Sequence, residues 1–450
     1  MISRINFQRK GSKLQAADSL MRSVSERTGI VKSLNQVLVE RDDPRVFNVM
    51  AIESSIQRLV DHGMEADIAA AAAGFSLSDA IERAIGEALE RYALAFCDLD
   101  VVTFGSYNEL SGVMDCEIYD PEKLFFFSDA QYQEDKFPFT RFCHDTVVGW
   151  APATSLATGE TCLFPAQMLF FGYQLQEGEA QICYATSNGC AAGQSISQAV
   201  LKGCLEAVER DGVMLTWFRK VANPRLDISR SAFLQDLMEV HFACPTLVFN
   251  LLLADTGVGI PTVIGIVLDE ASRRCRFVMG AAANLDPEQA AVKALLESGG
   301  QGRPYLKFLS ASRPVALSSI DELQDFPDTL VFYGAAENYK YVSFLLDSQV
   351  EIPINSVPSL SSQTVEEDLL TTVKLLYERG FHPYYVDLTT PDLRYLGVSV
   401  VRAVVPDLVP FSSPAYPYLG PPRLLSQEIT GGVDPTHGAS ALNCLPHPFP

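Results

Sequence analysis

Two short stretches of the sequence each place two glutamates and an arginine where they can act together. They are "GEALER" at 86–91 and "LEAVER" at 205–210, and both contain the pattern Glu-x-x-Glu-Arg. Side chains three and four positions apart share one face of an α-helix, so each stretch would project two carboxylates and a guanidinium to the same side. A single such stretch favours an exposed ion pair, which is worth roughly 0.3 to 0.5 kcal/mol and has no function by itself.

Both stretches belong to an internal repeat. Residues 74–91, "GFSLSDAIERAIGEALER", align without a gap on residues 193–210, "GQSISQAVLKGCLEAVER". The glutamates and arginines are the same in the two copies, whereas positions expected to face solvent differ, for example Arg83 and Lys202. If the repeat had no function, its glutamates and arginines should have diverged as much as the other solvent-facing positions. Because they have not, the repeat favours a functional site over an exposed ion pair.

A fainter third copy covers residues 284–303, "NLDPEQAAVKALLESGGQGR". It keeps Glu297, but Gly300 and Gln301 take the places of the second glutamate and the arginine. Each copy is predicted to form a strand or loop, a turn of small residues and then a helix. Ser, Asp and Pro near its start suit an N-cap and first turn, and apolar residues then recur with the helical period.

The four carboxylates of the first two copies, Glu87, Glu90, Glu206 and Glu209, would repel one another unless cations neutralise them. Oxygen ligands without histidine are those that Mg²⁺ prefers, and bound Mg²⁺ commonly shares its coordination shell with phosphates. The pattern therefore predicts a magnesium site that binds a nucleotide.

Other kinds of site are excluded by the motifs that the sequence lacks. It contains no GxxxxGK[ST], CxxC, HExxH or GxSxG, and "GVGIPT" at 257–262 ends in Thr262 where the dinucleotide fingerprint has glycine or alanine. The six histidines show no metal-ligand spacing. The net charge of −21 argues against binding to nucleic acid or to an anionic membrane.

Composition predicts a globular protein with a large core. Of the 450 residues, 48% are hydrophobic, and neither an apolar run of about 18 residues nor a signal peptide is present, so we expect a cytoplasmic protein whose ten cysteines are reduced thiols. We expect an α+β fold, with helices packed on mixed β-sheets. Residues 1–70 would form an N-terminal subregion and residues 71–450 the core.

Further segments connect the chain to a known family. The two Glu-x-x-Glu-Arg helices, "SNGCAAG" at 187–193 and the terminal "PHPFP" resemble the YcaO family, in particular its azoline-forming cyclodehydratases, which modify ribosomally made peptides. "ADSLMR" (17–22), "RTGIV" (27–31), "YYVDLT" (384–389), "GVSVVRAVVPDL" (397–408) and "LGPPRL" (419–424) are similar to other segments of the family. The resemblance covers roughly residues 18–450.

The resemblance implies an ATP site without a phosphate loop. In it the four glutamates would hold Mg²⁺ ions against the phosphates, and the arginines would contact phosphate or orient the carboxylates. The implied nucleotide contacts come from Lys13, Ser19, Glu87, Glu90, Arg91, Ser187, Asn188, Glu206, Glu209, Arg210, Gln301 and Arg303. One departure leaves the third copy open: the family has Gln three residues after its glutamate, whereas Gln301 follows Glu297 by four.

The implied reaction is the ATP-dependent cyclodehydration of Cys, Ser or Thr in a precursor peptide. The side chain attacks the preceding backbone carbonyl, the oxygen is phosphorylated, and loss of phosphate leaves a thiazoline or oxazoline. In the family a PxPxP end marks azoline formation and is thought to organise the active site. This assigns catalytic roles to Pro446, Pro448, Pro450 and His447, although a lone His in a tail is more often not catalytic.

The resemblance also implies partners. Because the chain starts almost directly with the YcaO-like segment, we expect a separate leader-binding partner, E1-like or ThiF-like, to deliver the peptide to this stand-alone D-type component. The resemblance further implies that the chain forms a homodimer and that a flavin-dependent dehydrogenase acts after it. The expected product is a bacteriocin or a toxin. The alternatives are a YcaO enzyme that makes a thioamide or a macrocyclic amidine, and a non-catalytic scaffold that only docks a partner.

Overall fold

The computed structural model describes residues 19–54, 69–312, 319–323, 325–426, 432 and 441–449. Two of the predicted site residues, Lys13 and Pro450, lie outside these ranges. In the part that is described, no helix is both long and apolar enough to cross a membrane.

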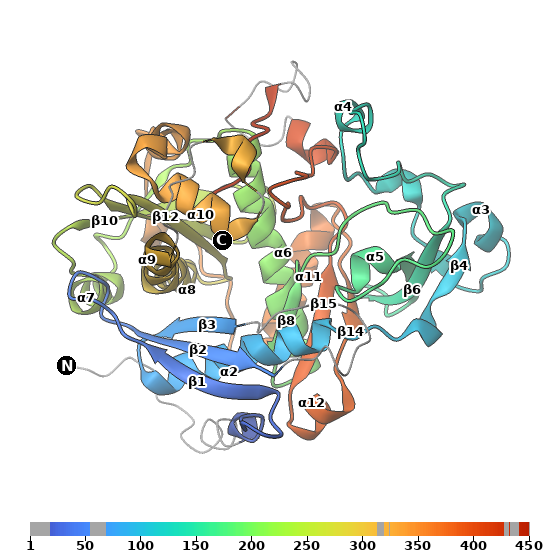
Figure 1. The fold of residues 1–450 in the computed structure, drawn as a ribbon, viewed down its shortest axis with the longest axis horizontal. Helices are drawn as coiled ribbons and strands as arrows, with labels where there is room; N and C mark the ends of the chain where they lie inside the picture. Colours follow the sequence, from blue (N-terminus) through green and yellow to red (C-terminus); the bar gives the residue numbers. More distant parts are fainter. Residues whose placement is uncertain are drawn as a thin grey trace.

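An antiparallel sheet of three strands lies at the N-terminal side of the molecule (Figure 1). Its strands run in the order β1 (Val31–Val37), β2 (Phe47–Glu53) and β3 (Ala69–Gly74). Helix α2 (Leu77–Leu94) packs on this sheet through an apolar face that includes Ile85 and Leu89. The predicted boundary at residue 70 falls inside β3, which pairs with β2.

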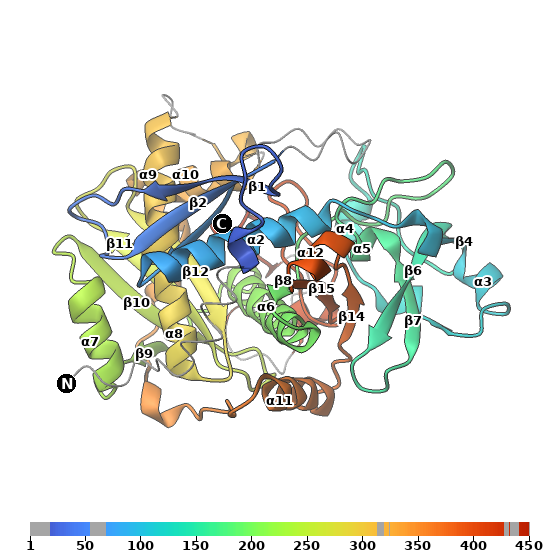
Figure 2. The same cartoon turned by 90° about the horizontal axis from the view of Figure 1, so that it is seen from below.

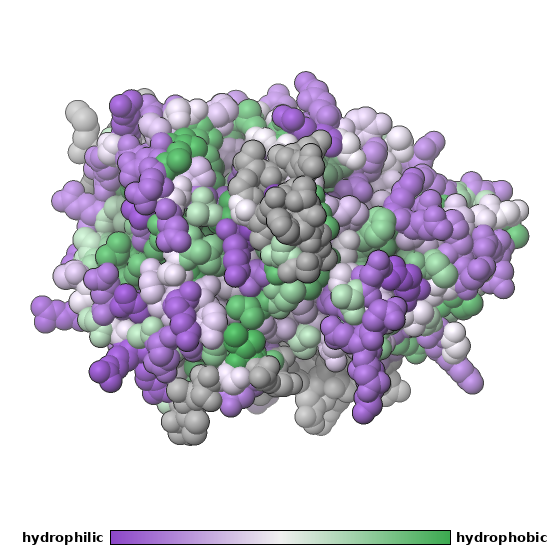
Figure 3. Space-filling view, turned by 90° about the horizontal axis from the view of Figure 1, so that it is seen from above, coloured by the Kyte–Doolittle hydropathy of each residue, from purple (hydrophilic) through white to green (hydrophobic). Residues whose placement is uncertain are grey.

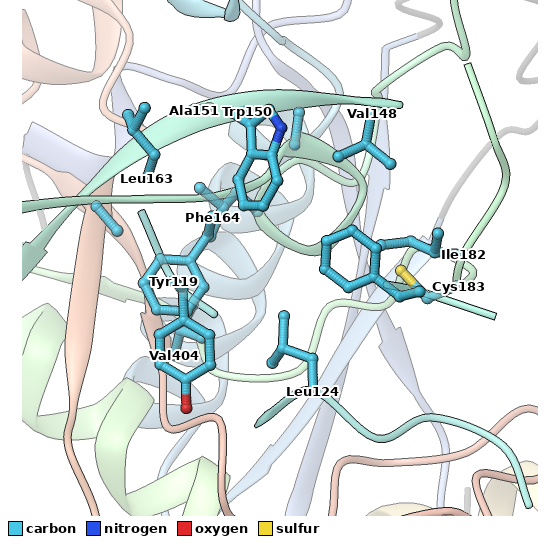
Figure 4. Close-up of a cluster of buried hydrophobic side chains, with 14 of the residues drawn as sticks. Tyr119, Leu124, Val148, Trp150, Ala151, Leu163, Phe164, Ile182, Cys183 and Val404 are labelled. Atoms are coloured by element: carbon cyan, nitrogen blue, oxygen red, sulfur yellow. The ribbon is translucent and has the colours of Figure 1, made fainter. Parts of the chain in front are cut away.

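A second, mixed sheet is built from strands in the middle and the C-terminal part of the chain. Its main path is β5 (Glu117–Ile118), β7 (Thr161–Pro165), β6 (Val148–Ser155), β14 (Tyr384–Asp387), β15 (Ser399–Val404) and β8 (Cys190–Gly193), and β4 (Thr103–Gly105) pairs with β6. Only β5 and β7 run parallel among these pairs. Aromatic residues such as Trp150 and Phe164 fill the core below β6 and β7 (Figure 4).

The third sheet has the order β12 (Phe277–Ala283), β11 (Thr262–Asp269), β10 (Leu247–Ala254), β9 (Arg225–Asp227) and β13 (Glu351–Pro353). Every residue of β11 and β12 is buried, as their continuous apolar sequences lead one to expect. Helix α8 (Pro287–Leu295) follows β12, and a π-helix (Leu296–Gly302) joins it to α9 (Arg303–Ser312).

Helix α6 (Ile196–Phe218) is the central helix of the molecule (Figures 1 and 2). It packs on β8 and β15 of the second sheet and on β12 and β11 of the third, so it joins the two sheets. The remaining helices are α3 (Tyr107–Leu110), α4 (Asp129–Tyr132), α5 (Ala166–Leu169), α7 (Ala232–His241), α10 (Phe326–Gly334), α11 (Val365–Glu378) and α12 (Pro391–Tyr395). Polar side chains cover most of the face shown in Figure 3, with small apolar areas between them.

The structure confirms the predicted repeat of strand, turn and helix. The three copies are β3–α2, β8–α6 and β12–α8, and their helices begin after N-caps at matching repeat positions, Ser76, Ser195 and Asp286. Glycine is required at the end of the first two strands, because a Cβ on Gly74 or Gly193 would lie 2.7 Å from the backbone nitrogen of the following helix. The same small-residue turn therefore aims each helix at the same region.

A buried ion pair fixes the segment "LGPPRL" to α6. The guanidinium of Arg423 donates to both oxygens of Asp211, at 2.8 Å each, and also to the carbonyl of Thr256. Asp211 is fully buried and follows the second Glu-x-x-Glu-Arg pattern directly.

We expect Arg423→Met to lower the free energy of unfolding by about 3 kcal/mol, because the buried Asp211 would lose the partner of its ion pair. Urea denaturation followed by circular dichroism measures this. The matched control is Arg394→Met, which removes an exposed pair with Asp387 and should cost less than about 1 kcal/mol. Equal losses in the two variants would contradict the prediction.

Candidate nucleotide and metal site

The structure brings the glutamates of α2 and α6 together, as the repeat predicts. Glu87, Glu90 and Glu206 are half-buried and Glu209 is buried. Burial, and then the negative charges of Glu206 and Glu87, raise the pKa of Glu90 well above its usual range. Since Glu206 lies on the other helix, the carboxylates of α2 and α6 are close enough for their charges to act on one another.

Each arginine of the pattern contacts at least one glutamate of its own helix. Arg91 donates to Glu87 at 2.6 Å and to the carbonyl of Ala69 at 3.1 Å. Arg210 donates to Glu209 at 2.7 Å and lies 3.4 Å from Glu206. Two guanidinium groups therefore neutralise only part of the charge of four carboxylates, and the remainder suits divalent cations.

The glutamate of the third copy also belongs to this cluster. Burial and the charge of Glu209 raise the pKa of Glu297 to about 8, and its carboxylate accepts a hydrogen bond from the backbone of Ala281 at 3.2 Å. Glu297 and Gln301 both lie in the π-helix, where a turn takes one residue more than in an α-helix. The extra residue between them, which departs from the family pattern, is thus accommodated by the wider turn.

Other predicted contacts lie elsewhere or are already engaged. Arg303 is 1% exposed and donates to Asp43, Asp42 and Asp269, at 3.1, 3.3 and 2.9 Å, so the structure joins it to these aspartates and not to the glutamates. The Ser19 hydroxyl donates to the carbonyl of Leu396 at 2.5 Å. Their predicted nucleotide contacts would require these bonds to change.

"SNGCAAG" lies beside α6. Ser187 is exposed, and Asn188 lines a small cavity of about 80 Å³ with Ala207 and Arg402. The buried amide oxygen of Asn188 has no hydrogen-bond partner among the residues described. The protein itself therefore does not satisfy this oxygen, and the role of Asn188 in lining the site stays a prediction.

The C-terminal segment 441–449, called the tail below, docks against α6. Trp217 and Tyr333 donate to the carbonyls of Leu445 and Pro446, at 2.7 and 2.6 Å. The Phe449 ring is 2% exposed, and its centroid lies 4.8 Å from the guanidinium carbon of Arg210. The tail thus reaches the arginine that orients Glu206 and Glu209.

His447 anchors this tail. Its ring is 1% exposed, lies 4.5 Å from that of Phe411, and donates from Nε2 to the carbonyl of Ser412 at 2.7 Å. Burial lowers the pKa of His447 to about 4, so the ring is neutral at pH 7. Pro448, itself buried, separates His447 from Phe449 in the chain, and its ring restricts the backbone there.

Glu53, at the end of β2, is a member of the cluster that the sequence analysis missed. It is buried beside Arg91 and Glu87, and one carboxylate oxygen has no hydrogen-bond partner among the described residues. Burial raises its pKa to about 8. No signal marked it, because "NVMAIE" reads as an ordinary strand and the other repeat copies have no counterpart.

The raised pKa values predict how pH affects stability. Glu206 and Glu297 have pKa values of about 7 and about 8 in the folded chain, against about 4.3 when unfolded, so their protonation stabilises the folded chain fully below about pH 4. This contribution is lost as pH rises through 7 and 8. The thermal midpoint measured in EDTA should therefore fall from pH 6 to 9, and Mg²⁺ should restore it most at high pH. A rise in EDTA would contradict the raised values.

The donor set fits a magnesium–nucleotide complex. Carboxylates that repel one another and bind protons near neutral pH, without a histidine or thiolate among them, are suited to hard divalent cations. Such a donor set is the one expected of a metal-dependent, nucleotide-binding enzyme in which carboxylate-bound metal, instead of a phosphate loop, would neutralise the phosphate charge.

Comparison with known proteins identifies the family. The family model described as YcaO cyclodehydratase, ATP- and Mg²⁺-binding, matches residues 71–409, and the chain therefore belongs to the YcaO family. An uncharacterized protein of Methanothermobacter thermautotrophicus is 28% identical over 352 residues, which cover 75% of this chain and 81% of that protein.

Solved structures share the fold. A heterocyclase in complex with substrate and cofactor has a TM-score of 0.76 at 23% identity, over 97% of this chain. YcaO from Methanopyrus kandleri, bound with AMPPCP and Mg²⁺, has a TM-score of 0.62 at 21% identity, over 87% of this chain and 91% of its own. The E. coli microcin synthetase McbBCD complex with pro-MccB17 bound gives 0.52 at 16% identity, over 83% of this chain and 87% of that chain. The chain spans little more than half, 57%, of the heterocyclase.

The family match confirms the predicted family, together with the cyclodehydratase class and the cofactors ATP and Mg²⁺ that its description names. The solved structures confirm the fold. The assignment of individual residues to ATP or to Mg²⁺ remains a prediction.

Proposed function

We propose that the chain converts Cys, Ser or Thr residues of a ribosomally made precursor peptide to thiazolines or oxazolines, with ATP as the activating reagent. The observation that carries this proposal is the docked tail, which places Phe449 on Arg210 beside the glutamates. A tail docked against the predicted nucleotide site would match the role that the PxPxP end has in azoline-forming members. The fold of a substrate-bound heterocyclase supports the same class of reaction.

The chain's own residues would position the nucleotide and neutralise its negative charge. Glu87, Glu90, Glu206 and Glu209 would hold Mg²⁺, Arg91 and Arg210 keep the carboxylates oriented, and Asn188 offers an unpaired amide oxygen. ATP supplies a phosphoryl group when it is bound. Positioning and charge neutralisation are the main contributions of a protein to phosphoryl transfer.

The covalent change takes place on the peptide. The side-chain sulfur or oxygen loses its proton and bonds to the preceding carbonyl carbon, and the carbonyl oxygen takes the terminal phosphoryl group of ATP, which leaves as ADP. This oxygen then leaves with the phosphate while the amide nitrogen loses its proton, and a C=N bond forms. Each ring therefore removes one water from the peptide.

We further propose that a leader-binding partner protein delivers the precursor, and that the chain forms a homodimer. The microcin synthetase complex with its bound precursor supports an assembly of several components. A dehydrogenase could follow in the same assembly and would act after this chain.

Mass spectrometry of a precursor peptide incubated with the chain, partner, Mg²⁺ and ATP tests the proposal. Loss of one water per ring, with ADP and phosphate formed in equal amount, is the expected result. A gain of sulfur in place of oxygen would instead show a thioamide, and water loss with closure onto the peptide N-terminus a macrocyclic amidine. Unchanged peptide without ATP turnover would show a scaffold.

A further inference from the structure

The cavity of about 80 Å³ lies where α6 meets β15 of the second sheet. Most of its wall is apolar, and Leu124, Cys183 and Val404, which are labelled in Figure 4, are part of that wall. Phe125 also lines the cavity and is 48% exposed, so the wall continues onto the molecular surface. A mostly apolar cavity that reaches the surface is suited to hold part of a ligand.

This cavity borders the predicted nucleotide site on two sides. One side is formed by Ala207, which directly follows Glu206 in α6. Another side is formed by Pro410, and the ring of the next residue, Phe411, lies 5.2 Å from the guanidinium carbon of Arg210. A ligand in the cavity would therefore lie beside both the glutamates of α6 and the loop that holds the tail.

Arg402, on β15, brings a buried positive charge to the cavity. It lines the cavity and is only 2% exposed. Its Nε donates to the sulfur of Cys190 at 3.1 Å, and its two terminal nitrogens donate to the carbonyls of Met168 and Thr186. Burial raises the pKa of the Cys190 thiol to about 12, so all three acceptors are uncharged.

No carboxylate is paired with Arg402 in the part of the chain that the structure describes. Burial raises the pKa of Glu206, and the charges of Arg210 and, more weakly, Arg402 oppose this rise. Glu206 nevertheless accepts its hydrogen bond from Arg210, at 3.4 Å. By contrast, Arg303 and Arg423 each donate to buried aspartates. Arg402 is therefore a buried cation that only neutral groups hold.

A cation in such surroundings acts strongly on a ligand. Neutral acceptors satisfy its hydrogen bonds but leave its charge uncompensated, and apolar walls strengthen the field of that charge in the cavity. A guanidinium has five N–H donors, and the three bonds of Arg402 use three of them. The cavity therefore offers positive potential and further donors to an oxygen atom of a ligand.

We propose that Arg402 binds, in this cavity, a backbone carbonyl oxygen of the precursor peptide, at the residue before the Cys, Ser or Thr that is cyclised. An amide group is uncharged, as a mostly apolar cavity requires, and its oxygen accepts a strong, charge-assisted hydrogen bond from a guanidinium. The same oxygen is phosphorylated in the proposed reaction, and Arg402 would hold it beside α6. The inference rests on the proposed function and names the group that holds its substrate.

Isotope-edited infrared spectroscopy tests this contact directly. The precursor peptide carries a ¹³C=O label at the residue before the Cys, Ser or Thr, and it is bound to the full chain with partner, Mg²⁺ and a non-hydrolysable ATP analogue. A charge-assisted hydrogen bond weakens the C=O bond, so the labelled band should move to lower frequency on binding. With Arg402→Met the shift should be lost, and with Arg402→Lys it should be smaller. A labelled band that is the same in the original chain and in both variants would overturn the inference.

Kinetics separate this role from support of the fold. Arg402→Met should lower kcat/KM for the peptide by roughly 10- to 100-fold, as expected for the loss of one charged hydrogen bond, while KM for ATP stays within twofold. Arg402→Lys keeps the charge and should retain part of the activity. The matched control is Arg225→Met on β9, which removes an arginine that also donates to a backbone carbonyl, that of Leu346 at 3.4 Å, and does not line the cavity.

The outcomes distinguish the inference from the proposed function. Equal losses in Arg402→Met and Arg225→Met, or a parallel rise of KM for peptide and for ATP, would show that Arg402 only supports the fold. If Arg402→Met did not fold, the kinetics and the infrared band of Arg402→Lys would decide. An original chain that binds the labelled peptide but removes no water from it with ATP would contradict the proposed function, and the inference with it.

Discussion

Glu206→Gln should reduce Mg²⁺-dependent ATP binding and the rate of ATP turnover by at least 100-fold. Glu206 faces Glu90 of the other helix and Glu209 and Arg210 of its own, so it lies at the centre of the charged cluster. Glutamine keeps its size but removes the negative charge. Loss of one such group from a preorganised charged site typically costs 100- to 1,000-fold in rate.

The stability of Glu206→Gln separates this effect from misfolding. Because burial already raises the pKa of Glu206 to about 7, an uncharged side chain suits the metal-free fold. The thermal midpoint in EDTA at pH 8 should therefore stay the same or rise while Mg²⁺ affinity falls. Glu239→Gln, on the exposed face of α7, is the control and should change neither quantity. ATP affinity within twofold of the original chain would contradict the prediction.

The repeat explains why much of the site could be predicted from sequence. Two copies with the same spacing between N-cap and glutamates must present those glutamates at the same position along their helices. Glu87 follows the N-cap Ser76 by as many residues as Glu206 follows Ser195. The fold class follows from the same pattern, because each strand–turn–helix unit must bury its helix against a sheet.

Residues that join the site through the tertiary fold had no such signal. Glu53 enters from β2 because that strand pairs with β3, directly before α2. Arg303 is bound by Asp42 and Asp43, about 260 positions earlier in the chain, and sequence spacing contains no information on that pairing. The only trace of the π-helix in the sequence is the spacing of four between Glu297 and Gln301, where the family has three.

The second large effect should come from the tail. Phe449→Leu should lower the rate of ATP turnover by about 10-fold while changing the thermal midpoint little. Leucine retains most of the buried apolar volume but has no π face, so the guanidinium of Arg210 loses one of the two rings that hold it, the other being Phe411 at 5.2 Å. Arg210 then holds Glu206 and Glu209 less firmly, and the metal ligands lose their fixed geometry.

Phe449→Ala distinguishes this positioning role from simple packing. Removing a buried ring costs about 3 to 5 kcal/mol, so alanine should lower both the stability and the rate, whereas leucine should lower the rate alone. Phe308→Leu, at a ring on α9 that is 67% exposed, is the matched control. If Phe449→Leu kept full turnover, the contact with Arg210 would serve only to dock the tail. A selective loss of rate would show instead that the tail acts on the carboxylates through a single arginine.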